Sequence, residues 1–238
     1  MAQRNPSLRK VGFIIFSVAI VMAALLILVK AVPDLESTLY GFIKFNYPRL
    51  YSLSCPVLMT PLDQLPVTIR LHNSLDRNLK WFVEAQFSAP GLMDTYDQTL
   101  ELQPGETRKL SWQVGKQNID LGNFIFARVF TSATTASGMQ EATCGTFVLK
   151  LPFSGGPVIY FATLAITVVA IGVGFFLWKH NAELGDPGLT SRLWWMSFMC
   201  LVIAIGFIST LLGFWFLALV MVLLMVLTTG VYLIPHKE

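Results

Sequence analysis

Cysteine is the residue type in this chain whose placement most directly predicts a covalent bond. Cys55 and Cys144 bracket a strand-patterned stretch, the first just before its earliest predicted strand and the second entering its last. Because the first and last strands of a β-sandwich can lie close together, we expect a Cys55–Cys144 disulfide. Two free thiols, or pairing with a partner chain, are the alternatives. The bond would close a loop of about 90 residues, for which chain entropy predicts roughly 4–5 kcal/mol of stabilisation. Cys200 stands in an apolar run and is expected to be a buried, unreactive side chain.

The other potentially reactive residues do not form patterns typical of a catalytic or metal site. No two of the three histidines have metal-ligand spacing, and there is no Cys-x-x-Cys pair. Ser154-Gly155-Gly156 is expected to be a linker, and Gly172-x-Gly174 lies in an apolar run where it would permit helix contact. We therefore expect no enzyme activity, no cofactor and no metal. The residues expected on strand faces, in turns or beside span ends are His72, His180, His236, Asp94, Asp97, Glu101 and Glu106.

Three apolar runs without charged residues lie before and after the strand-patterned stretch, and they predict the helices on either side of it. The chain has 238 residues, 54% of them hydrophobic and 13% charged, which is about half the charge of a typical soluble domain. A helix of about 20 apolar residues crosses a bilayer. The last run, as one helix, would be roughly 63 Å long, so we expect it to fold back near Ser209, Thr210 and Gly213. The uncharged runs are 11–29, 157–178 and 193–234, and the four predicted spans are 11–30, 156–178, 193–209 and 212–234.

Basic residues near the span ends predict that both termini face the cytoplasm. Lys and Arg concentrate on the cytoplasmic side of membrane proteins, and here they mark the N-terminal segment 1–10, the loop 179–192 and the tail 235–238. The segment 31–155 would then be extracytoplasmic, in a cell inner or plasma membrane. A cleaved signal peptide is the alternative for the first run, although its apolar stretch exceeds the usual length of about 7–15 residues. The basic residues are Arg4, Arg9, Lys10, Lys179, Arg192 and Lys237, with Lys30 an outward exception.

Residues 55–155 have the pattern of a β-sandwich with about seven strands. Val67, Ile69 and Leu71 alternate with polar neighbours, which is typical of a strand with one buried face. The stretch 122–130 is apolar on both faces and predicts a central strand. The preceding segment 31–54 would extend the first helix or lie along the membrane interface, and Pro48 limits any helix there. The predicted strands lie near 56–60, 66–73, 79–88, 96–102, 108–114, 122–133 and 143–151.

Seven short strands in about 100 residues point to an immunoglobulin-like topology. An early strand ends in Leu71-His72-Asn73 with Asp76 in the turn, and later come Leu102-Gln103-Pro104-Gly105-Glu106 and Leu110-Ser111-Trp112. In these motifs the run from Pro66 to Val114 resembles the bacterial cell-adhesion-related (CARDB-type) immunoglobulin-like surface modules. The resemblance implies a hairpin turn at the Pro-Gly-Glu element and an extracytoplasmic setting, and it carries over no catalytic or binding residue. The expected fold class is an α+β membrane protein, with one immunoglobulin-like β-sandwich and four transmembrane helices.

Two classes of function fit this organisation. The first is a non-enzymatic interaction protein, a scaffold or accessory subunit of an envelope complex, with the lipid bilayer and other integral membrane proteins as partners. The second is a membrane-tethered module that binds a glycan or peptide through exposed aromatics, although core packing is the alternative for each ring. An accessory part of a transporter is less favoured, because the predicted spans contain no ionisable Asp, Glu, Lys or Arg between their ends. The net charge of +3 arises mainly at the predicted cytoplasmic ends, so it implies no nucleic acid partner. The candidate aromatics are Trp81, Phe82, Tyr96 and Trp112.

Overall fold

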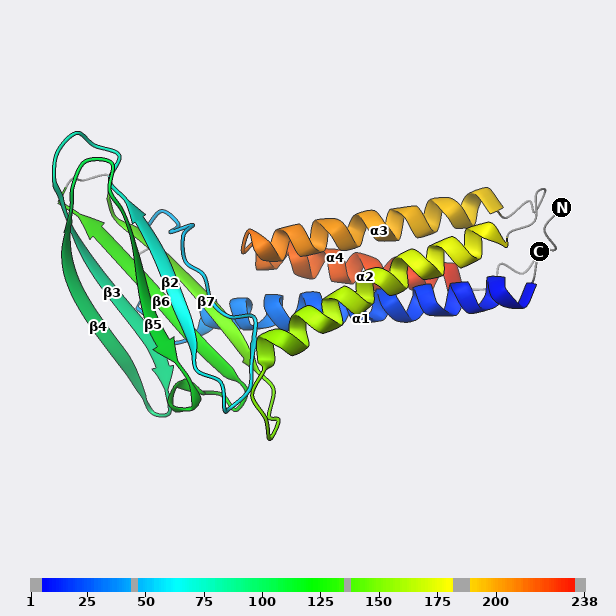
Figure 1. Ribbon diagram of the computed structural model, residues 1–238, viewed down its shortest axis with the longest axis horizontal. Coiled ribbons are helices and arrows are strands. Elements are labelled where there is room, and N and C mark those ends of the chain that lie inside the picture. The colour runs from blue at the N-terminus through cyan, green and yellow to red at the C-terminus, as the bar shows by residue number, and fades with distance from the viewer. Residues whose placement is uncertain (1–5, 44–46, 135–137, 182–188, 234–238) are drawn as a thin grey trace. The chain divides into compact units, whose positions relative to one another are not determined.

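The computed structural model of the chain describes residues 6–43, 47–134, 138–181 and 189–233. Within them the chain forms four helices and seven strands, and is therefore an α+β protein, as expected (Figure 1). It divides into two compact units, one formed by Met1–Ala31 with Ile159–Glu238 and the other by Val32–Val158. His236 and the tail 235–238 lie outside the described residues, as do 182–188 of the predicted loop and the first five residues.

Four apolar helices contain the uncharged runs of the sequence, and three of them are long and apolar enough to cross a membrane. The last run folds back, as expected. α3 ends at Leu211, and Gly213 follows with a φ of 68°, a left-handed conformation that glycine adopts readily. Apolar helices of this length are typical of membrane proteins. The helices are α1 Pro6–Leu39, α2 Gly156–His180, α3 Leu189–Leu211 and α4 Trp215–Leu233, whose shorter apolar stretch is Trp215–Thr229.

Glycines bring α1 and α2 into backbone contact. An added Cβ at Gly12 would lie 2.7 Å from the Trp178 backbone nitrogen, and one at Gly174 would lie 2.7 Å from the Phe16 backbone nitrogen. Small residues at helix crossings allow this close approach and are common between transmembrane helices. Gly172, by contrast, has no atom within 4 Å of the position where a Cβ would stand. The Gly172-x-Gly174 motif therefore supports helix contact through its second glycine.

The unit Val32–Val158, called the β unit from here on, contains two sheets. The larger has the strand order β1-β7-β6-β3-β4, and the smaller pairs β2 with β5. β1 runs parallel to β7, and all the other neighbours are antiparallel. The first and last strands are therefore neighbours, as the disulfide prediction required. The strands are β1 Leu58–Met59, β2 Leu65–His72, β3 Leu79–Ala89, β4 Leu92–Leu102, β5 Thr107–Val114, β6 Phe124–Ala133 and β7 Gln140–Val148.

Two predicted strand starts are wrong by a few residues. β4 begins at Leu92 rather than near 96, because Pro90-Gly91 forms a two-residue turn and pairing with β3 resumes at once. Gly91 has a φ of 80°, which a residue with a side chain rarely adopts. β7 begins at Gln140 rather than near 143, because polar residues can extend a ladder through their backbone groups. Cys144 consequently lies within the strand instead of at its start.

The core lies between the two sheets and follows the predicted alternation. Val67, Ile69 and Leu71 of β2 are buried, with at most 2% of their surface exposed. β6 lies between β7 and β3 and is the central strand that its apolar sequence predicted. The residues of β3 and β6 that share this core are Leu79, Trp81, Val83, Ala85, Phe87, Ile125, Ala127, Val129 and Ala133.

The other face of the larger sheet is covered by the chain that follows α1. The Tyr40 ring lies against Phe126 with ring centroids 4.6 Å apart, and its hydroxyl donates to Asp120 Oδ2 at 2.5 Å. Burial, together with this carboxylate, raises the pKa of Tyr40 to about 12. Farther along, Tyr47 lies 5.3 Å from Phe130. The segment 31–54 thus extends the helix as far as Leu39 and then packs on the sheet.

We expect Gly174→Val to weaken the α1–α2 contact and Gly172→Val to leave it intact. A valine at position 174 would place its side chain inside the backbone of α1, an overpacking cost of about 1–3 kcal/mol. Both substitutions add the same atoms to the same helix, so the change in helix propensity is matched. Thermal unfolding in one detergent should give a lower midpoint for Gly174→Val alone, and equal midpoints would contradict the crossing.

Candidate functional site

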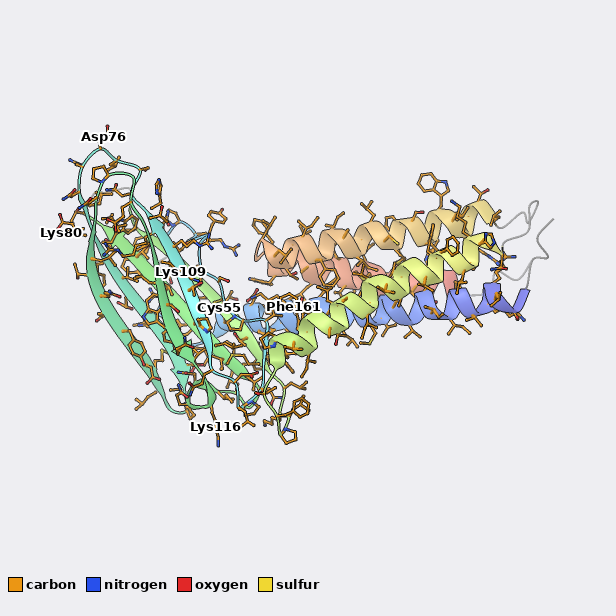
Figure 2. The ribbon with its side chains drawn as sticks, in the orientation of Figure 1. Cys55, Asp76, Lys80, Lys109, Lys116 and Phe161 are labelled. Atoms are coloured by element: carbon orange, nitrogen blue, oxygen red, sulfur yellow. A yellow bond between two sulfur atoms is a disulfide. The ribbon has the colours of Figure 1, made fainter. Side chains whose placement is uncertain are left out.

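The Cys55–Cys144 disulfide predicted from the sequence is present. It joins residues 89 positions apart, and their Cα atoms are 6.3 Å from each other. Cys144 stands on the core face of β7, opposite Ala127 of β6. Cys55, labelled in Figure 2, lies three residues before β1. The bond therefore ties the entry to the first strand to the middle of the last.

The aromatics predicted to contact a ligand occupy different environments. Trp81 is buried in the core, with 8% of its surface exposed. Tyr96 on β4 is 51% exposed and Trp112 on β5 is half-buried. Both of these rings lie against Phe87, at centroid distances of 5.8 and 6.1 Å. Tyr96 and Trp112 therefore share Phe87 as a neighbour. Phe82 is 37% exposed and lies on the opposite face of β3.

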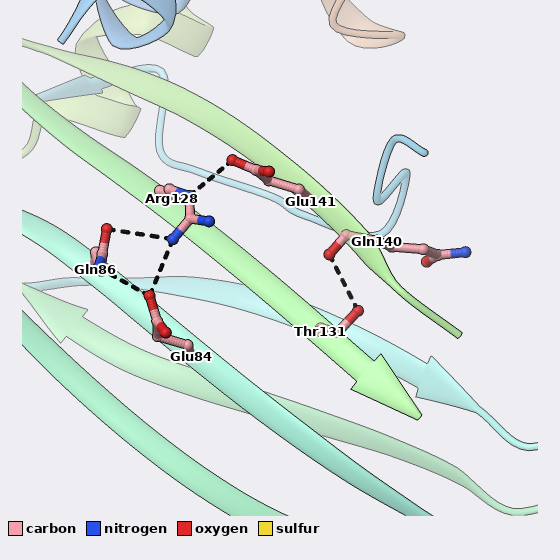
Figure 3. A network of polar contacts seen from close by, with 6 residues as sticks. All are labelled: Glu84, Gln86, Arg128, Thr131, Gln140 and Glu141. Atoms are coloured by element: carbon pink, nitrogen blue, oxygen red, sulfur yellow. Dashed lines mark hydrogen bonds and ion pairs between the residues drawn. The ribbon is translucent and has the colours of Figure 1, made fainter. Parts of the chain in front are cut away.

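A buried arginine organises the outer face of the larger sheet (Figure 3). Arg128 on β6 is 1% exposed, and its Nε donates to Glu141 Oε1 at 2.7 Å. Its Nη1 donates to Glu84 Oε1 at 3.0 Å and more distantly to Gln86 Oε1 at 3.4 Å. Gln86 also donates to Glu84 Oε1 at 2.8 Å, and the guanidinium lies 5.9 Å over the Phe130 ring. One cation thus ties together β3, β6 and β7.

The cluster fixes the relative positions of its strands. An unpaired charge in a protein interior costs several kcal/mol, so the Arg128 guanidinium requires both carboxylates to stay within reach. Glu141 pairs directly across from Phe130, whereas Arg128 pairs with Thr143. The Arg128–Glu141 contact is therefore diagonal, and a slip of one residue would break it. The cluster therefore fixes the register of these strands and the positions of its own charged groups.

The edge of β7 is completed by segments from several parts of the chain, because β1 covers only its end. The Gly145 N–H donates to Asp34 Oδ1, in the last turns of α1, at 3.0 Å. Gly145 is needed here, since a Cβ would overlap the Pro33 carbonyl group. Glu141 exchanges two backbone hydrogen bonds with segment 48–50, of 2.9 and 3.0 Å. This edge of the sheet is therefore covered.

Asp63 fixes the first residues of α2. Its Oδ1 accepts the Gly155 N–H at 2.8 Å, and its Oδ2 accepts the N–H groups of Gly156 at 2.9 Å and Thr60 at 2.8 Å. Burial alone would raise the pKa of Asp63, but these hydrogen bonds outweigh it and hold the pKa below its ordinary value of 3.8. The carboxylate also satisfies otherwise unpaired N–H groups at the start of the helix, as a capping residue does.

Sequence reasoning missed Arg128, Asp34 and Asp63. Arg128 carried a signal, because it is the one charged residue in the apolar run 122–133 and a charge in a central strand must be buried and paired. The two aspartates gave no comparable signal. Asp34 acts on a backbone group 111 residues away, and Asp63 on one 92 residues away, so only the fold brings the partners together.

The two histidines that the structure describes, His72 and His180, each contact a different neighbour. His72 Nδ1 lies 2.9 Å from Thr107 Oγ1 on an exposed strand surface. The His180 ring stacks on Phe176 with centroids 5.6 Å apart. Within the described ranges no three His, Cys, Asp or Glu residues form a group that could hold a metal ion.

No known family model matches the chain, and no curated protein matches it. Among solved structures it is similar to Bacteroides uniformis beta-glucuronidase 2 covalently bound to cyclophellitol-6-carboxylate aziridine, with a TM-score of 0.29 and 13% identity over 35% of this chain. A calcium-binding mutant of the same enzyme is similar with a TM-score of 0.30 and 12% identity, also over 35% of this chain. The matched region spans 11% of each enzyme chain. At such TM-scores the likeness carries no argument about this protein.

We expect Glu141→Gln to be strongly destabilising because it leaves the buried Arg128 guanidinium without its closest counter-charge. Breaking a buried ion pair by removing one partner typically costs about 3–5 kcal/mol. Adding Arg128→Met to this variant removes the stranded cation, so the double variant should recover part of the loss. Glu101→Gln, at an exposed site on β4, is the control for a lost carboxylate charge. Unfolding free energies of the full chain in detergent would measure the cycle, and purely additive effects would contradict the pairing.

Protonation of the Asp63 carboxylate should make the protein less stable in acid. Because its folded-state pKa is lowered, its contribution is fully present above its ordinary pKa of 3.8 and is lost as the pH falls through the folded-state value. Asp63→Asn keeps the size but replaces the carboxylate that accepts three N–H groups, and should cost about 1–3 kcal/mol at pH 7. The gap in stability between the two proteins should narrow as the pH falls below 3.8 and should close below the folded-state pKa. Unfolding measured at pH 7 and pH 3 tests this, and an unchanged gap between them would count against the role.

Proposed function

We propose that this protein is a membrane-anchored interaction protein, a scaffold or accessory subunit of a cell-envelope membrane complex. Its four helices cross the membrane, both termini lie in the cytoplasm, and the β unit is extracytoplasmic. The length and apolar character of three helices support the spans, as does the tight turn that leads into α4. The Cys55–Cys144 bond supports the extracytoplasmic setting, because disulfides persist in oxidising compartments.

The observation that carries the proposal is the anchoring of the β unit at both of its chain ends. Asp34 binds the end of α1 to β7, and Asp63 binds the first residues of α2 to the loop after β1. A domain held at both ends through short connections has little reach. Contact with neighbouring integral membrane proteins suits it better than capture of distant targets. The likeness to immunoglobulin-like surface modules, which implies an extracytoplasmic setting, belongs to the same proposal.

A membrane-tethered glycan- or peptide-binding module is the second candidate. The observation that favours it is the pair of partly exposed rings, Tyr96 and Trp112, that both lie against Phe87. Aromatic rings with one accessible face supply rigid contact area at low entropic cost. Trp81 adds nothing to such a surface because it is buried in the core.

The tagged full-length protein, solubilised from its own membranes in mild detergent, should retain integral membrane proteins in fixed stoichiometry. Membranes that lack the tagged protein and carry an isotopic label should be mixed in before solubilisation. Partners bound in the cell then remain unlabelled, whereas proteins that associate after lysis carry the label. A partner-free monomer would sink the interaction proposal. If that monomer bound an immobilised glycan and lost binding in Tyr96→Ala, with Phe82→Ala as the control, the second candidate would replace it.

A further inference from the structure

β4 is an edge of the larger sheet that no other described strand covers. It pairs with β3 along all eleven of its residues and stands last in the strand order. No backbone hydrogen bond joins its other side to any residue that the structure describes. The opposite edge differs, because β1, segment 48–50 and the Asp34 carboxylate share the backbone groups of β7. Among the described residues, the backbone groups along the β7 edge of the sheet therefore have hydrogen-bond partners and those along the β4 edge have none.

The register identifies the backbone groups of β4 that point away from the sheet. The Lys80 carbonyl accepts the Thr134 N–H beyond the end of β6, so even-numbered residues of β3 direct their backbone groups toward β6. Odd-numbered residues of β3 then bond to β4, where their partners are even-numbered. The outward-facing backbone groups of β4 are those of Met93, Thr95, Asp97, Thr99 and Glu101.

This edge lacks several of the common protections against strand addition. β4 contains no proline and no lysine, and its unbroken register with β3 leaves no bulge. Exposed long edges of this kind are templates for another strand. Its charges are three carboxylates, of Asp94, Asp97 and Glu101, without a base. Asp94 accepts from the Asn118 amide at 3.1 Å and Glu101 from the Asn78 amide at 3.0 Å, whereas Asp97 has no partner among the described residues.

Asp97 stands in a row of carboxylates that crosses the sheet. Glu84 of β3 lies directly opposite it, and Glu141 stands in the same row on β7. Arg128 forms ion pairs with Glu84 and Glu141, so this cation lies on the far side of Glu84 from the edge. Like charges directly opposite each other are destabilising, most of all in the close pairs that are not hydrogen-bonded. A base on an added strand beside Asp97 would place a cation next to this carboxylate on the side away from Glu84.

We propose that the outer edge of β4 binds an extended, basic segment of a partner protein as an added β-strand. The five outward-facing residues supply backbone donors and acceptors, and Asp97 selects a lysine or arginine opposite it. The inference rests on the proposed function and names the chemistry of the partner. A second copy of this chain is a poorer occupant, because two β4 strands would bring six carboxylates together and, in the centred antiparallel register, set Asp97 against Asp97.

Binding of a defined peptide to the full chain in nanodiscs tests the proposal. The probe is a synthetic eleven-residue peptide that alternates lysine with valine and threonine, and its comparison peptide has glutamate in place of lysine. We expect the basic peptide alone to bind. Residue-resolved hydrogen exchange should then slow at Thr95, Asp97 and Thr99, with little change at Tyr96 and Gln98, whose amides already bond to β3. Uniform slowing, or equal binding of both peptides, would overturn the proposal.

Matched variants separate backbone pairing from charge. Thr99→Pro removes an outward N–H that β3 does not use and should weaken binding about tenfold or more, whereas Thr99→Val keeps that N–H and should bind normally. Asp97→Lys should weaken binding about fivefold or more, since a cross-strand attraction becomes a repulsion. Asp76→Lys makes the same charge change in the turn between β2 and β3, where Figure 2 shows it at the tip of the loop, and should have little effect. Equal losses from both charge reversals would overturn the proposal.

The same variants distinguish this inference from the broader function. In native membranes, a photo-cross-linker at Thr99 should join the edge to a Lys- or Arg-containing segment of a partner, and Asp97→Lys should abolish the adduct. If stoichiometric partners co-purify but survive both Thr99→Pro and Asp97→Lys, the interaction function stands and the β4 edge is not its site. An adduct between two β4 strands would instead identify a second copy as the occupant and overturn the basic partner. Absence of any partner would defeat both.

Discussion

The backbone groups of a sheet must find hydrogen-bond partners, and this requirement shapes the β unit around β7. β1 has only two residues, so it cannot serve the whole strand. The Asp34 carboxylate and segment 48–50 supply what β1 does not, which requires the end of α1 to lie against the sheet. The close approach of the Pro33 carbonyl then excludes any side chain at Gly145. The packing of Tyr40 on Phe126 follows from the same placement of the chain.

The polar contacts around this edge explain how a small domain keeps its ends fixed. The disulfide constrains the chain between Cys55 and Cys144, and Asp63 binds the chain where it leaves toward α2. These contacts differ in kind. The disulfide acts mainly by restricting the unfolded chain, whereas Asp63 acts in the folded state by satisfying N–H groups that a helix start leaves unpaired. Together they hold in place the first strand, the last strand and the point where the chain leaves the domain.

Local pattern predicted the strands well because a half-buried strand needs period-two alternation, as in Val67, Ile69 and Leu71. It also indicated the Cys55–Cys144 bond, since the first and last strands are neighbours. Pattern did not identify which helix face makes contact. Ala162 and Ala165 of α2 are exposed, whereas Gly174 meets the backbone of α1, and composition alone does not separate them. Asp34 and Asp63 escaped prediction because a carboxylate that binds distant backbone N–H groups leaves no periodic trace in the sequence.

Arg128 joins the interior of the domain to the charge on its surface. A well-packed apolar residue is often as stabilising as a buried ion pair or more so, so stability alone does not explain a buried arginine. The arginine instead determines where the neighbouring carboxylates lie. It draws Glu84 and Glu141 toward β6, and the carboxylate of Asp97 is left at the uncovered edge without a cation beside it. A neutral side chain at position 128 would leave Glu84 free to repel Asp97 more strongly, so the charge that β4 presents depends on a residue two strands away in the same sheet.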